Sequence, residues 1–364
     1  MVYPILLSEL YKEHKEEYIK AFSGFLDRGI FIGGSDVENF ENSMADYLKA
    51  KYVVGCGNGT QALELALKAN AIGQGDRVIT TANTYYATAR AIINVGAVPV
   101  FCDVDENGLI DVNKIESLIT KETKAIMPVH LYGISADLET IYRICEKNNI
   151  VCIEDCSHAF GSKYMNKNIG SDSYCACFSL YPTKNLGAFG DAGMISTDSN
   201  ELACKMRELR YYTSDPERVI FQKDGMHSRM DPLQACLLNV SMKYVDGWNV
   251  IRRKHCDYYI EQFKDKVPYM KGMENSDVIP YVFPIVADDQ NKFYEYLLSK
   301  GICPQIHYKP DLHHIDHLAL LEEVKLPMTE FLNAHIVSIP VSPTVTDEEV
   351  QYIAKTVLEF FGGC

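Results

Sequence analysis

The chain has 364 residues, a length that suits two domains better than one simple core. Its hydrophobic fraction of 47% is ordinary for a globular protein, and no apolar run reaches the roughly 18 residues of a membrane span. The net charge of -14 argues against a nucleic-acid-binding surface, and the charged N-terminus argues against a signal peptide. We therefore expect a cytoplasmic protein that binds neither nucleic acid nor membranes.

Twelve cysteines are scattered along the chain, without a CxxC pair or a zinc-like spacing. Several lie in apolar, strand-like runs, among them Cys152, Cys175 and Cys177, where cysteine behaves as a small hydrophobic residue. Free thiols are expected, because a disulfide framework is uncommon at this chain length.

The first 245 residues alternate between apolar, strand-like runs and stretches with helical periodicity. Strands are predicted at 52–57, 78–82, 98–104, 125–131, 151–155, 175–180 and 192–197. Several of these runs are continuously apolar, which is typical of a mostly parallel sheet buried on both faces. The helical segments between them predict an α/β domain, with a central sheet between helices, over 1–245.

The pattern changes near residue 246, where a long helical stretch over 248–264 begins. Further strands are predicted near 279–286, 302–308 and 336–340. Thr346 and Glu349 form a capping box that predicts the start of a last helix. These elements predict a smaller α+β domain over 246–364.

Two turns that follow predicted strands have the composition of a ligand site, because open α/β sheets bind ligands beyond the carboxyl ends of their strands. The turn Gly57-Asn58-Gly59-Thr60 leads into a helix, whose N–H groups and dipole can hold a phosphate. Tyr85, after the strand at 78–82, can stack on a planar ring. Each has a structural alternative, since the turn can simply cap its helix and the tyrosine can pack on the core.

Two charged residues complete this pattern. Asp155 ends the apolar strand 151–155, where a buried carboxylate needs a partner such as a protonated pyridine nitrogen; the alternative is a helix N-cap. Lys184 follows 175–180 in an apolar, glycine-rich loop, where burial lowers the pKa of an amine and makes it a nucleophile toward carbonyl groups. Phosphate cradle, aromatic ring, acid and lysine in this order predict a pyridoxal phosphate enzyme with Lys184 as its Schiff-base residue.

Several longer motifs support this interpretation. They are GCGNGTQAL at 55–63, NTYYAT at 83–88, GAVPVFCDVD at 96–105, VHLYG at 129–133, IEDCSHAFG at 153–161, FSLYPTKNLGAFGDAG at 178–193 and SRMDPLQA at 228–235. With these motifs the chain resembles, over essentially its whole length, the sugar-nucleotide aminotransferases of the DegT/DnrJ type. The resemblance implies the aspartate-aminotransferase-like type I fold of pyridoxal phosphate-dependent transferases.

The resemblance also implies roles for individual residues. Lys184 would form the Schiff base with the cofactor, Asp155 would pair with the pyridine nitrogen and Tyr85 would stack on the ring. His158 occupies a position where the family often has Gln, near the ring hydroxyl. Gly59, Thr60 and Ser179 would hold the cofactor phosphate.

Family members of this type are homodimers with shared active sites, in which an Asn of the partner chain usually reaches the phosphate. In this chain the corresponding position, just before SRMDPLQA, is His227. A histidine can still donate a hydrogen bond, so His227 is expected to contact the cofactor of the partner subunit.

The loop around the lysine indicates where the sugar receives nitrogen. Relatives acting at carbon 3 of a dTDP-3-keto-6-deoxyhexose read FSFYPTKNLGALGDAG there, whereas relatives acting at carbon 4 tend to read FSFxxxKxxTTGEGG. This chain has Tyr181-Pro182-Thr183 and GDAG at 190–193, so the resemblance implies carbon 3, with carbon 4 as the alternative. Tyr181 is expected to offer its phenol to a sugar hydroxyl.

A stretch rich in histidine and tyrosine in the smaller domain resembles a region of the same 3-keto-sugar enzymes. We expect four of its residues to bind sugar hydroxyls: His307, Tyr308, His313 and His314. The alternative is a metal site that adds Asp311, Asp316 and His317. No metal is expected, because no ligand spacing repeats.

These features predict a ping-pong aminotransferase that moves nitrogen from L-glutamate to a nucleotide-linked keto-deoxysugar through the pyridoxamine form of the cofactor. Related pyridoxamine-dependent dehydratases have His in place of the lysine, so Lys184 argues against that activity. A cofactor-binding regulatory protein without turnover is a further alternative, against which the retained Lys184 and Asp155 argue. The nucleotide, the gluco or galacto configuration of the sugar and the pathway stay open.

Overall fold

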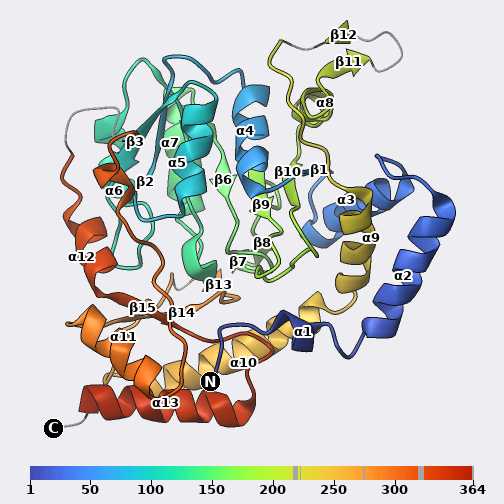
Figure 1. Ribbon diagram of the computed structural model, residues 1–364. Coiled ribbons are helices and arrows are strands. Elements are labelled where there is room, and N and C mark those ends of the chain that lie inside the picture. The colour runs from blue at the N-terminus through green and yellow to red at the C-terminus, as the bar shows by residue number, and fades with distance from the viewer. Residues whose placement is uncertain (216–219, 222, 274, 319–323, 363–364) are drawn as a thin grey trace.

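The computed structural model describes residues 1–215, 220–221, 223–273, 275–318 and 324–362. A central sheet lies between two layers of helices, and the C-terminal elements form a further layer below it in the view of Figure 1. This arrangement confirms the predicted α/β class. No helix of the described residues is long and apolar enough to cross a membrane.

The sheet is mostly parallel, as predicted. It has two four-stranded parts: β3 (Val98–Cys102), β2 (Arg77–Thr81), β4 (Thr123–Ile126) and β5 (Val151–Cys152) in that order, and β6 (Glu154–Asp155), β9 (Ala176–Ser179), β10 (Gly193–Thr197) and β1 (Tyr52–Cys56) in that order. A parallel bridge between Val129 and Asp155 joins the two parts. β5 and β6 are two halves of one predicted strand, separated by Ile153, whose N–H donates to the carbonyl of Ile126. Strand β10 alone runs antiparallel to its neighbours in this part of the described chain.

Consecutive residues of each strand face opposite helical layers, which explains the continuously apolar runs. Val53 of β1 packs in one core, and Val54 packs in the core on the opposite side. One layer contains α4 (Gly59–Ala69), α5 (Tyr86–Asn94) and α8 (Asn200–Leu209). The other contains α3 (Ser35–Leu48), α6 (Val112–Ile115), α7 (Leu138–Asn148) and α9 (Pro232–Ser241).

The C-terminal elements enclose a hydrophobic core of their own. It lies between α10 (Val245–Phe263), β14 (Phe283–Val286), α11 (Gln290–Ser299), β15 (Ile336–Ile339) and α13 (Asp347–Gly362). Val2 also packs there, and its N–H donates to the carbonyl of Gly301 at 2.7 Å. The N-terminus therefore crosses to this layer (Figure 1), and the division of the chain at residue 245 stays a proposal.

Among the C-terminal elements, the sequence predicted the start of the last helix correctly but also predicted a strand that the structure lacks. Thr346 and Glu349 form the expected capping box, with reciprocal bonds of 2.9 and 3.2 Å at the start of α13. The strand predicted at 302–308 is absent; only single bridges at Ile302 and Gln305 occur there. Pro304 lacks the N–H that a continuous ladder would need, so the apolar run does not pair along its length.

The remaining elements are short or peripheral. They are α1 (Leu7–Leu10), α2 (Lys15–Arg28), α12 (Pro327–His335), the strands β7 (Lys163–Tyr164), β8 (Lys167–Asn168), β11 (Thr213–Asp215), β12 (Ile220–Phe221) and β13 (Ser276–Asp277), and the 3-10 helices Glu116–Leu118, Leu131–Gly133 and Leu312–His314. Every cysteine in the described ranges is a free thiol, as predicted.

Candidate active site

Segments that follow β1, β2, β6 and β9 meet around one cavity of about 670 Å³. Because these four strands are parallel, their carboxyl ends lie at the same edge of the sheet. Ten of the residues singled out from the sequence line this cavity: Gly59, Thr60, Tyr85, Asp155, His158, Ser179, Tyr181, Lys184, His307 and Tyr308.

The N-terminus of α4 forms one end of the cavity. Asn58 caps this helix by accepting the N–H of Gln61 at 2.9 Å. The preceding residues Gly59 and Thr60, whose backbone N–H groups have no acceptor within the helix, line the cavity. A Cβ atom on Gly59 would lie 2.6 Å from the Cβ atom of Ser179. Glycine therefore lets the helix approach β9 closely, and places the hydroxyl of Ser179 beside the helix N-terminus. This combination suits a bound phosphate.

Asp155 is buried at the end of β6, and both of its carboxylate oxygens are held. Oδ2 accepts a hydrogen bond from the hydroxyl of Thr88 at 2.8 Å, and Oδ1 accepts one from the N–H of Ser157 at 3.1 Å. The hydroxyl of Thr88 also lies 2.9 Å from that of Thr84. Each oxygen keeps a free lone pair, so the carboxylate can accept a further bond from a ring N–H.

Lys184 lies partly buried in the loop after β9, and its backbone N–H donates to the carbonyl of Tyr181 at 2.8 Å. Its Nζ lies over the ring of Tyr281, 4.6 Å from the centroid. Burial lowers the pKa of Lys184 to about 8, and the negative charge of Asp155 opposes part of this shift. An amine with this pKa has a much larger neutral, nucleophilic fraction near neutral pH than an exposed lysine.

An aromatic wall closes the cavity on the side of the C-terminal layer. The ring of His158 stacks on Tyr281 with a centroid distance of 4.1 Å, and its Nε2 lies 2.8 Å from the hydroxyl of Tyr308. His307 Nδ1 lies 3.0 Å from the hydroxyl of Ser338. Burial, together with the positive charge of Lys184, holds the pKa of His158 well below its usual range and lowers that of His307 to about 3. Both imidazoles are therefore neutral.

Three predicted site residues lie elsewhere among the described residues. His227 is exposed; its carbonyl accepts from the side chain of Gln61 at 3.4 Å, but its ring does not line the cavity. His313 is turned toward Glu330, with Nε2 3.3 Å from a carboxylate oxygen, and His314 lies 3.6 Å from the carboxylate of Asp311. The structure therefore does not bring these two histidines together with Lys184.

Two residues that the sequence did not single out belong to the site. Thr88 lies one helical turn after Thr84 in the NTYYAT motif, so its hydrogen bond to Asp155 was open to prediction once a helix was assumed there. Tyr281 is almost a hundred residues beyond Lys184, and no motif links the two.

The residues present fit pyridoxal phosphate. The N-terminus of α4, with Thr60 and Ser179, would hold its phosphate, the carboxylate of Asp155 would accept a hydrogen bond from its pyridine nitrogen, and the amine of Lys184 would react with its aldehyde. Tyr85 leaves 59% of its surface open at the same cavity, which suits stacking on a ring.

Solved structures agree with this interpretation. The DesV protein of S. venezuelae superposes with a TM-score of 0.96 at 30% identity, over 100% of this chain and 99% of that one. Several structures with the same fold were solved with pyridoxal phosphate or pyridoxamine phosphate. Fold and site together define a pyridoxal phosphate-dependent aminotransferase of the type I fold.

Sequence comparisons identify the family. Residues 12–358 match the DegT/DnrJ/EryC1/StrS aminotransferase family, so the chain belongs to it. A protein of Geobacillus stearothermophilus named pleiotropic regulatory protein is 38% identical over 98% of this chain and 97% of its own length. The dTDP-3-amino-3,6-dideoxy-alpha-D-galactopyranose transaminase of Aneurinibacillus thermoaerophilus is 38% identical over 96% of this chain and 97% of its own length. The predicted family and fold are thus confirmed.

Proposed function

We propose that this protein transfers an amino group from L-glutamate to carbon 3 of a nucleotide-linked keto-deoxysugar, with pyridoxal phosphate as cofactor. The observation that carries the proposal is the placement of Lys184, with its lowered pKa, in the same cavity as the buried carboxylate of Asp155. The names of relatives support the substrate class, since the transaminase of Aneurinibacillus thermoaerophilus is named for a dTDP-linked 3-amino sugar.

Each side chain of the cavity has a distinct task in this reaction. Bound pyridoxal phosphate supplies an aldehyde carbon that receives nitrogen and a ring that accepts the electrons of the deprotonated donor carbon. The amine of Lys184 would hold the cofactor. Once this amine is free again, it would carry the proton from the donor carbon to the cofactor carbon. Asp155 keeps the pyridine nitrogen protonated. Tyr308 and His158 fix one another through their 2.8 Å contact.

The sugar is proposed to occupy the open side of the cavity. Tyr181 is 53% exposed there, three residues before Lys184, and its phenol can bond a sugar hydroxyl. His307 and Tyr308 line the same cavity. Nitrogen should therefore appear at carbon 3 of a dTDP-3-keto-6-deoxyhexose, and a carbon-4 ketone should react more slowly. NMR of the product decides between the two, because faster amination of the 4-keto isomer overturns the assigned position.

We also propose a homodimer with shared active sites. Helix α2 leaves an apolar stripe exposed, made of Ile19, Phe22 and Leu26, which the segment 30–32 extends. Folded monomers seldom leave such contiguous apolar surface in water, and a second copy would cover it. The stripe adjoins the proposed contact residue, since Gly33 lies against Tyr211, which pairs with His227.

Covalent trapping tests the central claim. Borohydride reduction of the cofactor-loaded protein should fix the pyridoxyl group on Lys184, as peptide mapping would show. Lys184→Ala should abolish transfer from glutamate, whereas Lys147→Ala should not, because Lys147 is at the far end of α7 in an ion pair with Glu116. A pyridoxyl group on another lysine contradicts the proposal.

A regulatory role without turnover is the second candidate, because one relative carries the name pleiotropic regulatory protein. The same experiments separate the two functions. A regulatory protein would bind the cofactor at Lys184 but leave the nitrogen of isotopically labelled glutamate unmoved. Transfer of the label to a ketosugar supports the aminotransferase.

A further inference from the structure

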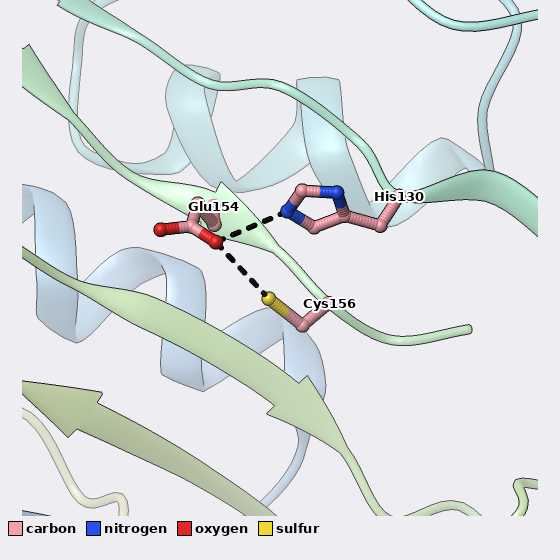
Figure 2. A group of neighbouring side chains, drawn as sticks. All are labelled: His130, Glu154 and Cys156. Atoms are coloured by element: carbon pink, nitrogen blue, oxygen red, sulfur yellow. Dashed lines mark hydrogen bonds and ion pairs between the residues drawn. The ribbon is translucent and has the colours of Figure 1, made fainter. Parts of the chain in front are cut away.

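A network of buried side chains lies behind Asp155, on the opposite side of β6 from the cavity. Glu154 is completely buried, and His130 Nε2 lies 3.1 Å from its Oε2. The thiol of Cys156 points to the same oxygen at 3.9 Å, as Figure 2 shows. The hydroxyl of Tyr142 donates to the other carboxylate oxygen. Neighbouring side chains of a strand point to opposite faces, so the side chains of Glu154 and Asp155 lie on opposite faces of β6.

The hydrogen bonds assign the tautomer of His130. The N–H of Ala136 donates to His130 Nδ1 at 3.0 Å, so that nitrogen carries no proton. The imidazole proton is therefore on Nε2, from which it is donated to Glu154. Among the described residues no Lys or Arg forms an ion pair with Glu154. The carboxylate consequently depends on its three donors, and a buried carboxylate that loses a donor is strongly destabilised.

His130 connects this network to Asp155 through the backbone. Its own N–H donates to the carbonyl of Asp155 at 3.0 Å, and the N–H of Asp155 donates to the carbonyl of Pro128 at 2.9 Å. One residue thus holds both members of β6, Glu154 through its side chain and Asp155 through its main chain. On the cavity side, Thr88 and Ser157 hold only the carboxylate of Asp155.

We propose that Glu154 and His130 form a positioning pair for Asp155. The pair keeps β6 in register with the segment 128–136, and thereby keeps the Asp155 carboxylate where the pyridine nitrogen is bound. This inference rests on the proposed function, because the position of Asp155 matters for a cofactor ring. Neither Glu154 nor His130 lines the cavity, so both act through Asp155.

The test is a double-mutant cycle between Glu154→Gln and Asp155→Asn, with kcat and KM measured for both substrates. Gln has nearly the same volume as Glu, but its NH2 group replaces an acceptor oxygen and faces a donor, so the hydrogen-bond network around residue 154 is weakened. Glu154→Gln should lower kcat roughly 10- to 100-fold with little change in KM, since small misplacements of a catalytic group have effects of this size. In the Asp155→Asn background the same change should cost less than about threefold, because its route of action is already removed. Equal losses in both backgrounds, or no loss in either, overturn the proposal.

A spectroscopic readout separates positioning from general destabilisation. The visible absorbance of the cofactor-loaded protein is titrated with pH for each variant. The midpoint pH of this titration should shift in the same direction for Glu154→Gln and Asp155→Asn. The shift should be smaller for Glu154→Gln. Glu41→Gln is the matched control, because Glu41 is a buried carboxylate paired with Arg207 and Arg210; it should lower the melting temperature and leave the midpoint in place. An unmoved midpoint in Glu154→Gln overturns the proposal.

Tyr142→Phe serves if Glu154→Gln fails to fold. It removes one donor from the same carboxylate and keeps the ring. It should lower kcat roughly three- to tenfold in the wild-type background and hardly at all with Asp155→Asn, whereas equal effects contradict the pair. If the wild-type protein transfers no nitrogen, the proposed function fails, and the absorbance titration still decides whether the pair positions Asp155.

Discussion

At the scale of single residues, the lowered pKa of Lys184 makes a prediction about pH. The amine is nucleophilic only when neutral, so cofactor capture by the cofactor-free protein should accelerate as the pH rises toward about 8 and level off above it. An exposed lysine would keep accelerating toward a pKa of about 10.4. Stopped-flow absorbance at a series of pH values gives the midpoint.

Asp155 supplies the control for that profile. Its negative charge raises the pKa of Lys184 against the effect of burial, so Asp155→Asn should move the midpoint to lower pH. A midpoint near that of a free lysine would mean that the amine is solvated. A midpoint unmoved by Asp155→Asn would mean that the two side chains do not interact.

Sequence reasoning located these two residues because each follows an apolar strand, and a charge in such a place needs a partner. It did not locate Tyr281, whose contact with Lys184 depends on how the C-terminal layer folds back over the sheet. It grouped His313 with His307 because both belong to a stretch that resembles the His/Tyr-rich region of the 3-keto-sugar enzymes. In the structure, His313 instead lies against Glu330, away from the cavity.

At the scale of elements, the close approach of α4 to β9 makes Gly59 necessary. The Cβ atom of an alanine there would lie 2.6 Å from that of Ser179, so the helix N-terminus would have to move away from the proposed phosphate position. Gly59→Ala should weaken cofactor binding roughly 10- to 100-fold, in line with overpacking costs of about 1–3 kcal/mol. Equilibrium dialysis against pyridoxal phosphate measures the change.

Gly247→Ala is the matched control, because nothing lies within 4 Å of a Cβ atom at that position in α10. It should leave cofactor affinity unchanged and raise stability by up to about 1 kcal/mol, since alanine has a higher helix propensity than glycine. Equal affinity for Gly59→Ala and the wild type would show that α4 can retreat without affecting the phosphate site.

The elements show which signals in a sequence carry fold information. Apolar runs located the strands of the central sheet to within a few residues, since both faces of that sheet are covered. The run at 302–308 looked similar, but Pro304 interrupts any ladder there. The hydrogen-bond partners of Glu154 could not be predicted either, because no local sequence pattern indicates that His130 and Tyr142 contact its carboxylate.

At the scale of the whole molecule, the exposed stripe on α2 and the position of His227 predict that two chains build each site. Co-expression of Lys184→Ala and His227→Ala chains tests this. In the hybrid dimer, the site that contains an intact Lys184 receives its His227 from the other chain, and the second site has neither. An equal mixture contains about half hybrids with one good site each, so about a quarter of wild-type activity is expected.

The activity of the mixture must be compared with the activities of the two mutant homodimers. Lys184→Ala homodimers should be inactive, and His227→Ala homodimers should be strongly impaired if the ring contacts the partner's phosphate. Full activity of the His227→Ala homodimer would remove His227 from the site. Changing Phe22 to Asp on the exposed stripe should yield monomers in light scattering, with loss of activity, because the second chain that completes the site has gone. A wild-type protein that is itself monomeric at assay concentration, and active, would contradict the shared site altogether.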